Sequence, residues 1–330
     1  MSSTLASPAF ADPSATTAAA LDGVVRVPGL GVIRAVGEQA AEFLQGQLTQ
    51  DVALMPVGTS RLAAFCNAKG RMLASFRVLK TSAHELLLVT SADTLPATLK
   101  RLSMFVLRAK VKLSDASSDF AVYGAIGPTA AAWVLNATQS IAARADGSRT
   151  TGQNDVQALV IALPDADGAA RALQLLPTDA PAPTGSALSS ADWAWAEIRA
   201  GVARVVPPVV EAFVPQMLNY ESADGVSFKK GCYPGQEVVA RSQFRGAIKR
   251  RAFVADVAGA AEAGQEVFDA SAPDQPVGLI AQAAPAPGGG TAVIVSLQLS
   301  AEHAADLRVG AADGPALSGL HLPFALRLDI

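Results

Sequence analysis

The most informative stretch of the chain is Phe228-Lys229-Lys230-Gly231-Cys232-Tyr233-Pro234-Gly235-Gln236-Glu237-Val238-Val239-Ala240-Arg241. Its Pro-Gly pair fits the two central positions of a type II turn, which needs a fixed φ followed by a positive one. The residues from Gln236 onward favour a helix, with Glu237 in its first turn. The stretch therefore predicts a turn that leads from Cys232 into a helix N-terminus.

Cys232 is the candidate reactive atom of this loop. A helix start and the neighbouring Lys230 both favour a thiolate over a thiol. A buried structural cysteine is the commoner situation, but the lysines, glycines, Gln and Glu around Cys232 are not typical of a core segment. Cys66 ends the apolar run Leu-Ala-Ala-Phe-Cys and is predicted to lie in the core.

Length and composition limit the class of protein. The chain has 330 residues, of which 50% are hydrophobic and 17% charged, so two or three globular subdomains are expected rather than a disordered chain. Two distant cysteines and three scattered histidines are too few for a self-contained zinc or iron–sulfur site, so no metal site is predicted. The same scatter argues against a cysteine hydrolase, which needs a histidine near the nucleophile.

The N-terminal residues 1–20 are rich in Ala, Ser, Thr and Pro and contain no Lys or Arg. They match neither a secretory signal nor a mitochondrial presequence, both of which carry positive charge. We predict that they form a disordered tail. No apolar run is long enough to cross a bilayer, so a cytoplasmic protein without a membrane partner is expected.

The residue pattern between positions 21 and 250 predicts two α+β halves with mostly antiparallel sheets. In the first half we expect strands at 30–36, 61–66, 72–78, 85–90 and 109–113, and helices at 38–50 and 95–106, the second capped by Asp93. In the second half we expect strands at 120–126 and 157–163 and helices at 128–135 and 167–176. A linker follows near 177–190, and then a helix that is capped by Ser190, carries Trp193 and is stopped by Gly201.

Residues 251–330 lose the helical signals. Short apolar runs at 252–257, 277–281, 291–299 and 324–328 are separated by Gly and Pro. This pattern favours a small C-terminal β-barrel.

The positive charge is concentrated in two segments. Residues 229–251 contain seven bases and one acid, and residues 69–112 contain nine bases and two acids, in a chain whose net charge is -3. The two segments could form one anion-binding surface. The alternative is that these bases are spread over solvated faces.

The stretch around Cys232 closely resembles the signature of the YgfZ family of folate-binding proteins, which are relatives of the aminomethyltransferase (T-protein) of the glycine cleavage system. The resemblance continues at residues 43–52, 66–71, 213–220 and 244–246, and so spans most of the chain from about 30 to 250. It implies a GcvT-like α+β fold, a ring of α/β subdomains with a central hole that ends in a β-barrel.

The resemblance also implies the chemistry. It implies tetrahydrofolate binding in the central hole and a role in assembling or repairing iron–sulfur enzymes, including those that thiolate tRNA. By its match to the family motifs, Cys232 and Lys230 are the candidate catalytic residues. The candidate folate-binding residues are Trp193, Leu30, Asn219, Gln216, Tyr233, Gln236, Glu237 and Arg241.

Three departures from the family pattern are visible. Leu30 replaces a family tryptophan that accompanies Trp193 in holding folate. Pro234 stands where the signature usually has Thr, and Val202-Ala203 follows Gly201 where Ile-Pro or Phe-Pro is common. None of these changes affects Lys230, Gly231 or Cys232.

Three functions stay open at this point. The first is a folate-dependent accessory protein that acts on iron–sulfur client enzymes through Cys232, with or without catalysing a reaction. The second is a folate-dependent aminomethyltransferase, for which no Asp matches the carboxylate that the T-protein needs. The third is RNA binding through the basic segments, as a weak contact, since aromatic residues make up only 5% of the chain.

Overall fold

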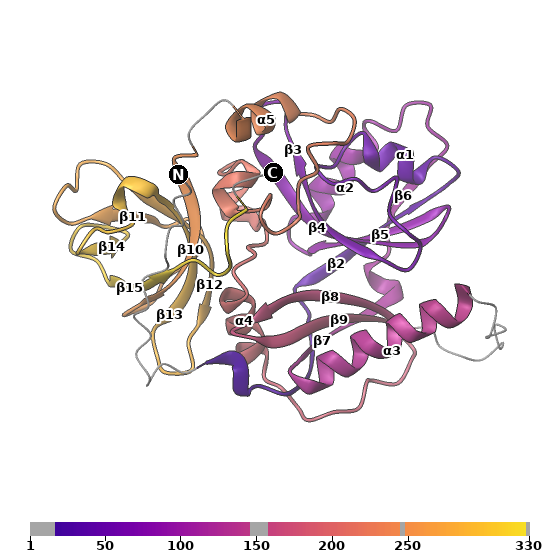
Figure 1. Ribbon diagram of the computed structural model, residues 1–330, viewed down its shortest axis with the longest axis horizontal. Helices are drawn as coiled ribbons and strands as arrows, with labels where there is room; N and C mark the ends of the chain where they lie inside the picture. The colour runs from indigo at the N-terminus through magenta and orange to yellow at the C-terminus, as the bar shows by residue number, and fades with distance from the viewer. Residues whose placement is uncertain (1–16, 146–157, 245–247, 328–330) are drawn as a thin grey trace, which may run out of the picture.

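The computed structural model describes residues 17–145, 158–244 and 248–327. Figure 1 shows three units around a common centre: a five-stranded sheet, a four-stranded sheet and a closed six-stranded barrel. Every strand pair among the described residues is antiparallel. The predicted α+β class, with antiparallel sheets and a C-terminal barrel, is confirmed.

The first sheet has the strand order β3-β4-β5-β2-β6. Its strands are β2 (Leu30–Val36), β3 (Ser60–Cys66), β4 (Met72–Ser82), β5 (Glu85–Ser91) and β6 (Lys112–Asp115). The helices α1 (Ala40–Gln45) and α2 (Leu95–Ser103) belong to the same unit. Side chains alternate along β3: Ala63 and Phe65 join the core of this unit, whereas Leu62 and Cys66 point to the centre of the molecule.

The second sheet has the order β1-β7-β9-β8. It consists of β1 (Gly23–Arg26), β7 (Phe120–Ile126), β8 (Leu159–Ala166) and β9 (Ala169–Pro177), with α3 (Pro128–Ala145) packed on it. The helix predicted at 167–176 is wrong, because Asp167 and Gly168 have φ of 49° and 86°. This Asp-Gly pair makes a hairpin turn that joins β8 to β9.

The barrel closes in the order β10-β13-β12-β11-β14-β15. Its strands are β10 (Arg250–Val257), β11 (Glu266–Asp269), β12 (Gly278–Pro285), β13 (Thr291–Gln298), β14 (Leu307–Val309) and β15 (Ala316–His321). The strands β11, β14 and β15 were not predicted. The strand predicted at 324–328 is wrong for residues 324–327, and residue 328 lies outside the described residues.

The remaining elements connect these units. Within the described ranges they are α4 (Ser190–Arg199), α5 (Gln236–Phe244) and five 3-10 helices: η1 (Ala18–Ala20), η2 (Ser117–Asp119), η3 (Pro207–Val209), η4 (Pro215–Leu218) and η5 (Leu299–Ala301). The cap residue of α4 is Ser189 and not the predicted Ser190, because Ser189 Oγ accepts from the Asp192 N–H at 3.0 Å. Gly201 then follows with φ of 68°, as expected at a helix end.

Other sequence expectations need correction at element ends. The predicted tail 1–20 is wrong for residues 17–20, since Ala18 is fully buried and its N–H donates to Asp167 Oδ2 at 3.0 Å. Residues 1–16 lie outside the described part of the chain. The helix expected at 38–50 is only α1, and Thr94 rather than Asp93 is the cap residue of α2. Residues 178–189, within the predicted linker, contain neither a helix nor a strand.

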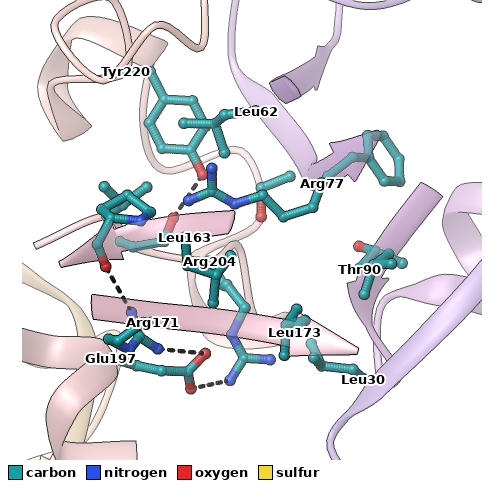
Figure 2. Close-up of a pocket in the computed structure, with 16 residues that line it drawn as sticks. Leu30, Leu62, Arg77, Thr90, Leu163, Arg171, Leu173, Glu197, Arg204 and Tyr220 are labelled. Atoms are coloured by element: carbon teal, nitrogen blue, oxygen red, sulfur yellow. Dashed lines mark hydrogen bonds and ion pairs between the residues drawn. The ribbon is translucent and has the colours of Figure 1, made fainter. Parts of the chain in front are cut away.

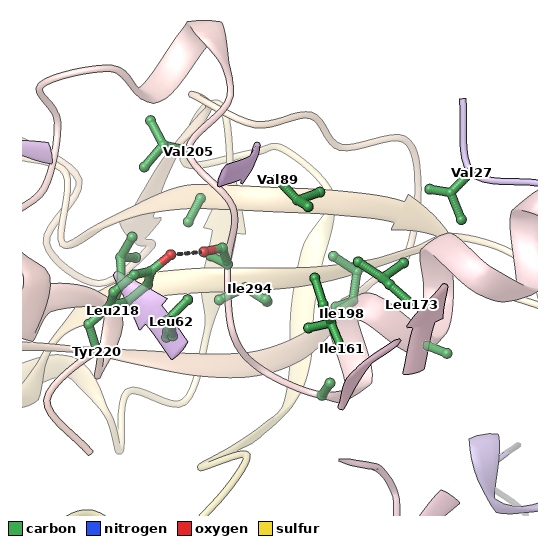
Figure 3. Close-up of a cluster of buried hydrophobic side chains, with 14 of the residues drawn as sticks. Val27, Leu62, Val89, Ile161, Leu173, Ile198, Val205, Leu218, Tyr220 and Ile294 are labelled. Carbon is green, nitrogen blue, oxygen red and sulfur yellow. Dashed lines mark hydrogen bonds between the residues drawn. The ribbon is translucent and has the colours of Figure 1, made fainter. Parts of the chain in front are cut away.

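One apolar core joins all three units. Figure 3 shows part of it, with Leu62 from the first sheet, Leu173 from the second and Ile294 from the barrel. The fully buried Tyr220 lies in the same cluster. Because each unit shares apolar surface with the others, their relative positions are fixed by packing.

Candidate functional site

A cavity lies where the two sheets face each other beside the segment that follows α4 (Figure 2). It contains about 540 Å³ of space outside protein atoms, part of which is open to solvent. Leu30, Val89 and Leu173 supply apolar wall from β2, β5 and β9. Its lining, apolar with a few converging polar groups, is typical of a small-molecule site.

The cavity wall carries three arginines and one carboxylate: Arg77, Arg171, Arg204 and Glu197. Arg204 Nη2 lies 3.0 Å from Glu197 Oε2, and Arg171 Nη2 lies 4.0 Å from Glu197 Oε1. Burial lowers the pKa of Arg171 to about 10, although the charge of Glu197 opposes this shift. At neutral pH the wall therefore has more positive than negative charge.

Trp193 of α4 lies behind this wall and is buried. The guanidinium carbon of Arg171 is 4.6 Å from the centre of a Trp193 ring. Gly124 lies so close to the indole that a Cβ at this position would be 2.5 Å from Trp193 Cζ3. Trp193 thus supports Arg171 and does not itself line the cavity.

Tyr220 completes one end of the wall. Its hydroxyl donates to the Ala203 carbonyl at 2.6 Å, and burial raises the pKa of Tyr220 to about 12. The phenol therefore stays neutral at physiological pH and cannot balance the arginine charge.

Several buried polar atoms of the wall have no hydrogen-bond partner among the described residues. They include Thr90 Oγ1, Arg171 Nε and Arg204 Nε, and behind them Trp193 Nε1. Buried polar groups are nearly always paired in folded proteins. Unpaired buried polar atoms are expected in a cavity that binds a polar ligand.

The Cys232 loop forms a second feature, on the surface beside α5. Gly235 has φ of 80° and the Gln236 N–H donates to the Tyr233 carbonyl at 3.1 Å, so the predicted turn is confirmed. A Cβ at Gly235 would be 2.3 Å from the Asn67 carbonyl oxygen, because the loop is seated against the turn between β3 and β4. Cys232 is exposed. α5 begins at Gln236, as the sequence predicted.

Lys230 is buried and points away from solvent. Its ammonium donates to the carbonyls of Gln45 and Leu48, the latter at 2.5 Å, and lies 4.7 Å from the centre of the Tyr233 ring. Burial lowers the pKa of Lys230 to about 8, against the raising effect of Asp51 and Cys232. Lys230 therefore ties the loop to the segment after α1, a structural role that the sequence did not reveal.

The other predicted site residues separate into three places. Of the predicted folate-binding set, Leu30 lines the cavity. Gln216 and Asn219 are fully buried, where their amide nitrogens donate to the Val239 and Ala252 carbonyls, both at 2.7 Å. The rest belong to the Cys232 loop or α5 and do not line the cavity: Tyr233, Gln236, Glu237 and Arg241.

The charged residues of the cavity were missed by sequence reasoning. Arg171 falls in the stretch that was wrongly assigned to a helix, and Glu197 and Arg204 belong to no family motif quoted above. A signal did exist, since Arg171 is a lone charge between Ala170 and Ala172 in an apolar strand, and such a charge needs a partner. Among the described residues of the two basic segments, Arg77 alone reaches the cavity wall.

Cys66 is buried with 1% exposure, as predicted, and burial raises its pKa to about 12. Among the described residues no three His, Cys, Asp or Glu side chains are grouped so that they could hold a metal ion. In the same part of the chain no helix is both long enough and apolar enough to span a bilayer.

Comparison with known proteins gives relatives along most of the chain. Residues 15–159 match the GCVT N-terminal domain. The tRNA-modifying protein YgfZ of Photobacterium profundum is 30% identical over 259 residues, which cover 77% of this chain and 75% of that protein. An uncharacterized protein of Haemophilus influenzae is 31% identical over 224 residues, 68% of this chain and 69% of its own.

The fold has a counterpart among solved structures. Aminomethyltransferase T of the glycine cleavage system from Bartonella henselae superposes with a TM-score of 0.58 at 16% identity, over 93% of this chain and 88% of that one. This likeness shows the GcvT-like fold.

Proposed function

This chain belongs to the YgfZ family of tRNA-modifying proteins, and from that premise we propose that it binds tetrahydrofolate in the cavity between the two sheets. We further propose that it serves the assembly or repair of iron–sulfur enzymes, including those that thiolate tRNA, through Cys232. The observation that carries the folate proposal is the cavity itself, with its apolar wall and its unpaired polar atoms.

The residues of the wall fit the chemistry of a folate. The pterin and aminobenzoyl rings are flat and largely apolar on their faces, and Leu30, Val89 and Leu173 offer apolar surface. The edges of the pterin carry several hydrogen-bonding groups, which suit the unpaired Thr90 and arginine atoms. When bound, tetrahydrofolate would supply a one-carbon carrier or a reduced ring.

Cys232 supports the second part of the proposal by its exposure beside a helix start. One accessible thiol cannot hold a four-iron cluster, which needs about four ligands. It can supply a single ligand during transfer, or act as a redox or nucleophilic thiol towards a client enzyme. Lys230 and Tyr233 hold the loop from behind and leave the thiol accessible.

Aminomethyl transfer is supported less well. In the T-protein a carboxylate is needed near the folate amine, and in the described part of this chain the one acidic residue of the cavity wall is Glu197. That carboxylate lies 3.0 Å from Arg204 and 4.0 Å from Arg171. Its two carboxylate oxygens are thus directed at two guanidinium groups and not at a ligand amine. Weak RNA contact through the basic segments stays a prediction.

A cell-based comparison of the two cysteines tests the role of Cys232. In cells that lack the native protein, Cys232→Ser should fail to restore the activity of tRNA-thiolating iron–sulfur enzymes. Cys66→Ser is the matched control and should restore it, with a modest loss of stability from a hydroxyl in an apolar strand. Purified Cys232→Ser should still fold and bind tetrahydrofolate. Full rescue by Cys232→Ser would show that the loop is a structural turn.

A further inference from the structure

The charges of the cavity wall are not balanced. Among the residues that the structure describes, Glu197 is the one carboxylate of the wall, and both Arg204 and Arg171 are directed at it. Figure 2 shows these two ion pairs at Glu197, whereas Arg77 lies apart from them, near Tyr220. Within the part of the chain that the structure describes, Arg77 has neither a salt bridge nor a hydrogen bond from its side chain.

Arg77 is held in this position by the sheet. It lies in β4 directly opposite Val89 of β5, and both residues line the cavity. Its neighbours in β4, Phe76 and Val78, are buried in the core on the other face. The guanidinium is half-buried, and burial lowers the pKa of Arg77, but an arginine remains cationic at neutral pH.

A guanidinium that lines a cavity and has no protein partner among the described residues is available to pair with an anionic ligand. The nearby phenol of Tyr220 is neutral and donates its proton to Ala203. A second polar group of the same wall, Thr90 Oγ1, is also unpaired although Thr90 is only 1% exposed. A half-buried cation and a buried hydroxyl, neither with a partner among the described residues, point to a ligand with an anionic end.

We propose that Arg77 binds a carboxylate of the ligand, so that the cavity distinguishes folates, which carry a glutamyl group, from uncharged pterins. This inference rests on the proposed function, since it names the part of a folate that this arginine recognises. A guanidinium matches a carboxylate with two parallel hydrogen bonds, which gives both affinity and orientation. Arg77 is thus a specificity-determining residue that no family motif quoted above includes.

The role of Arg77 is tested with two ligands of nearly equal size that differ in charge. Tetrahydrofolate is compared by calorimetry with its α,γ-diamide, in which neutral amides replace both glutamyl carboxylates. The wild-type protein should prefer tetrahydrofolate by about tenfold or more, as expected for a hydrogen-bonded charge pair. Arg77→Gln should bind both ligands with the affinity that the wild type has for the diamide, and Arg77→Lys should keep part of the preference.

Two controls separate recognition of the ligand carboxylate by Arg77 from a general change in surface charge or in stability. Arg101→Gln removes an exposed base of α2 outside the cavity and should leave the preference unchanged. The thermal midpoint of Arg77→Gln should not fall below that of the wild type, because the substitution removes an unpaired charge.

The outcomes distinguish the two proposals. Equal affinity of the wild type for tetrahydrofolate and its diamide would overturn the role of Arg77 and leave folate binding in place. An unchanged preference in a folded Arg77→Gln protein would also overturn it. A wild-type protein that binds neither ligand would overturn the proposed folate site itself.

Discussion

The Arg171 guanidinium carbon lies 4.6 Å from the centre of a Trp193 ring, and it is Arg171, not Trp193, that reaches the cavity wall. Under the folate proposal, Trp193 would therefore affect a ligand in the cavity through the arginine that it supports. Arg171 is also held by Glu197 and, at 3.5 Å, by the Pro164 carbonyl. This arrangement gives Trp193 a positioning role.

Trp193→Phe should lower the affinity for tetrahydrofolate by about threefold to tenfold, because a smaller ring holds the guanidinium less well. Titration of the purified variants measures this directly. Trp193→Ala should lower it further and should also destabilise the fold by about 3–5 kcal/mol, since a large buried ring is lost. Trp133→Phe, on α3, is the control and should bind as the wild type does. Unchanged affinity in Trp193→Ala would rule out any role of this residue in folate binding.

Leu30→Trp should raise the affinity for tetrahydrofolate. Leu30 lines the cavity at the position where the family pattern has a tryptophan. An indole there would add a flat aromatic face for the pterin, a contact worth about 0.5–1.5 kcal/mol beyond the area it buries. The check is a titration of both proteins in one buffer. Weaker binding by the variant would mean that the pterin does not lie against β2.

The two cysteines should differ strongly in reactivity. Cys232 is exposed, whereas Cys66 is 1% exposed and burial raises its pKa to about 12. At pH 8 iodoacetamide should therefore modify Cys232 rapidly and reach Cys66 only after unfolding. Peptide mass spectrometry over a time course follows both sites in one sample. Equal rates in the folded protein would contradict the placement of the two thiols.

The fold was largely predictable because its signals are local. Strands 30–36 and 120–126 agree with β2 and β7 residue for residue, since their apolar runs are bounded by glycines and turns. The error at 167–176 came from reading Ala and Leu as helix formers, where the Asp167-Gly168 turn decides the structure. The short barrel strands β11 and β14 carry too few residues for a periodic signal.

The site was less predictable because its charges meet only in three dimensions. Arg77, Glu197 and Arg204 come from β4, α4 and the segment after α4, and no spacing in the sequence relates them. The Cys232 loop was visible because its turn chemistry and its cysteine are adjacent. Lys230 illustrates the limit, since its bonds to Gln45 and Leu48 bridge more than 180 residues of chain.

Lys230 should make stability depend on pH in a defined window. Its pKa is about 8 in the folded protein and 10.5 for an ordinary lysine, so the unfolded chain binds more protons between these values. The free energy of unfolding that this group contributes therefore rises as pH increases from 8 to 10.5. The difference in thermal midpoint between the wild type and Lys230→Met should grow in favour of the wild type across this range.

The neighbouring Lys229 is exposed and provides the control for that experiment. Lys229→Met should show the same pH dependence of its thermal midpoint as the wild type. A pH-independent difference between the wild type and Lys230→Met would mean that the ammonium is well solvated in the folded protein.

The central claim is that tetrahydrofolate binds in the cavity between the two sheets, and filling that cavity tests it most directly. Val202 lines the cavity, whereas Val210, later in the same connecting segment, is exposed outside it. Calorimetric titration with tetrahydrofolate should show binding to the wild type and to Val210→Trp, and a loss of at least about tenfold in affinity for Val202→Trp. Binding of wild-type strength by a folded Val202→Trp protein would place the folate elsewhere and contradict the account.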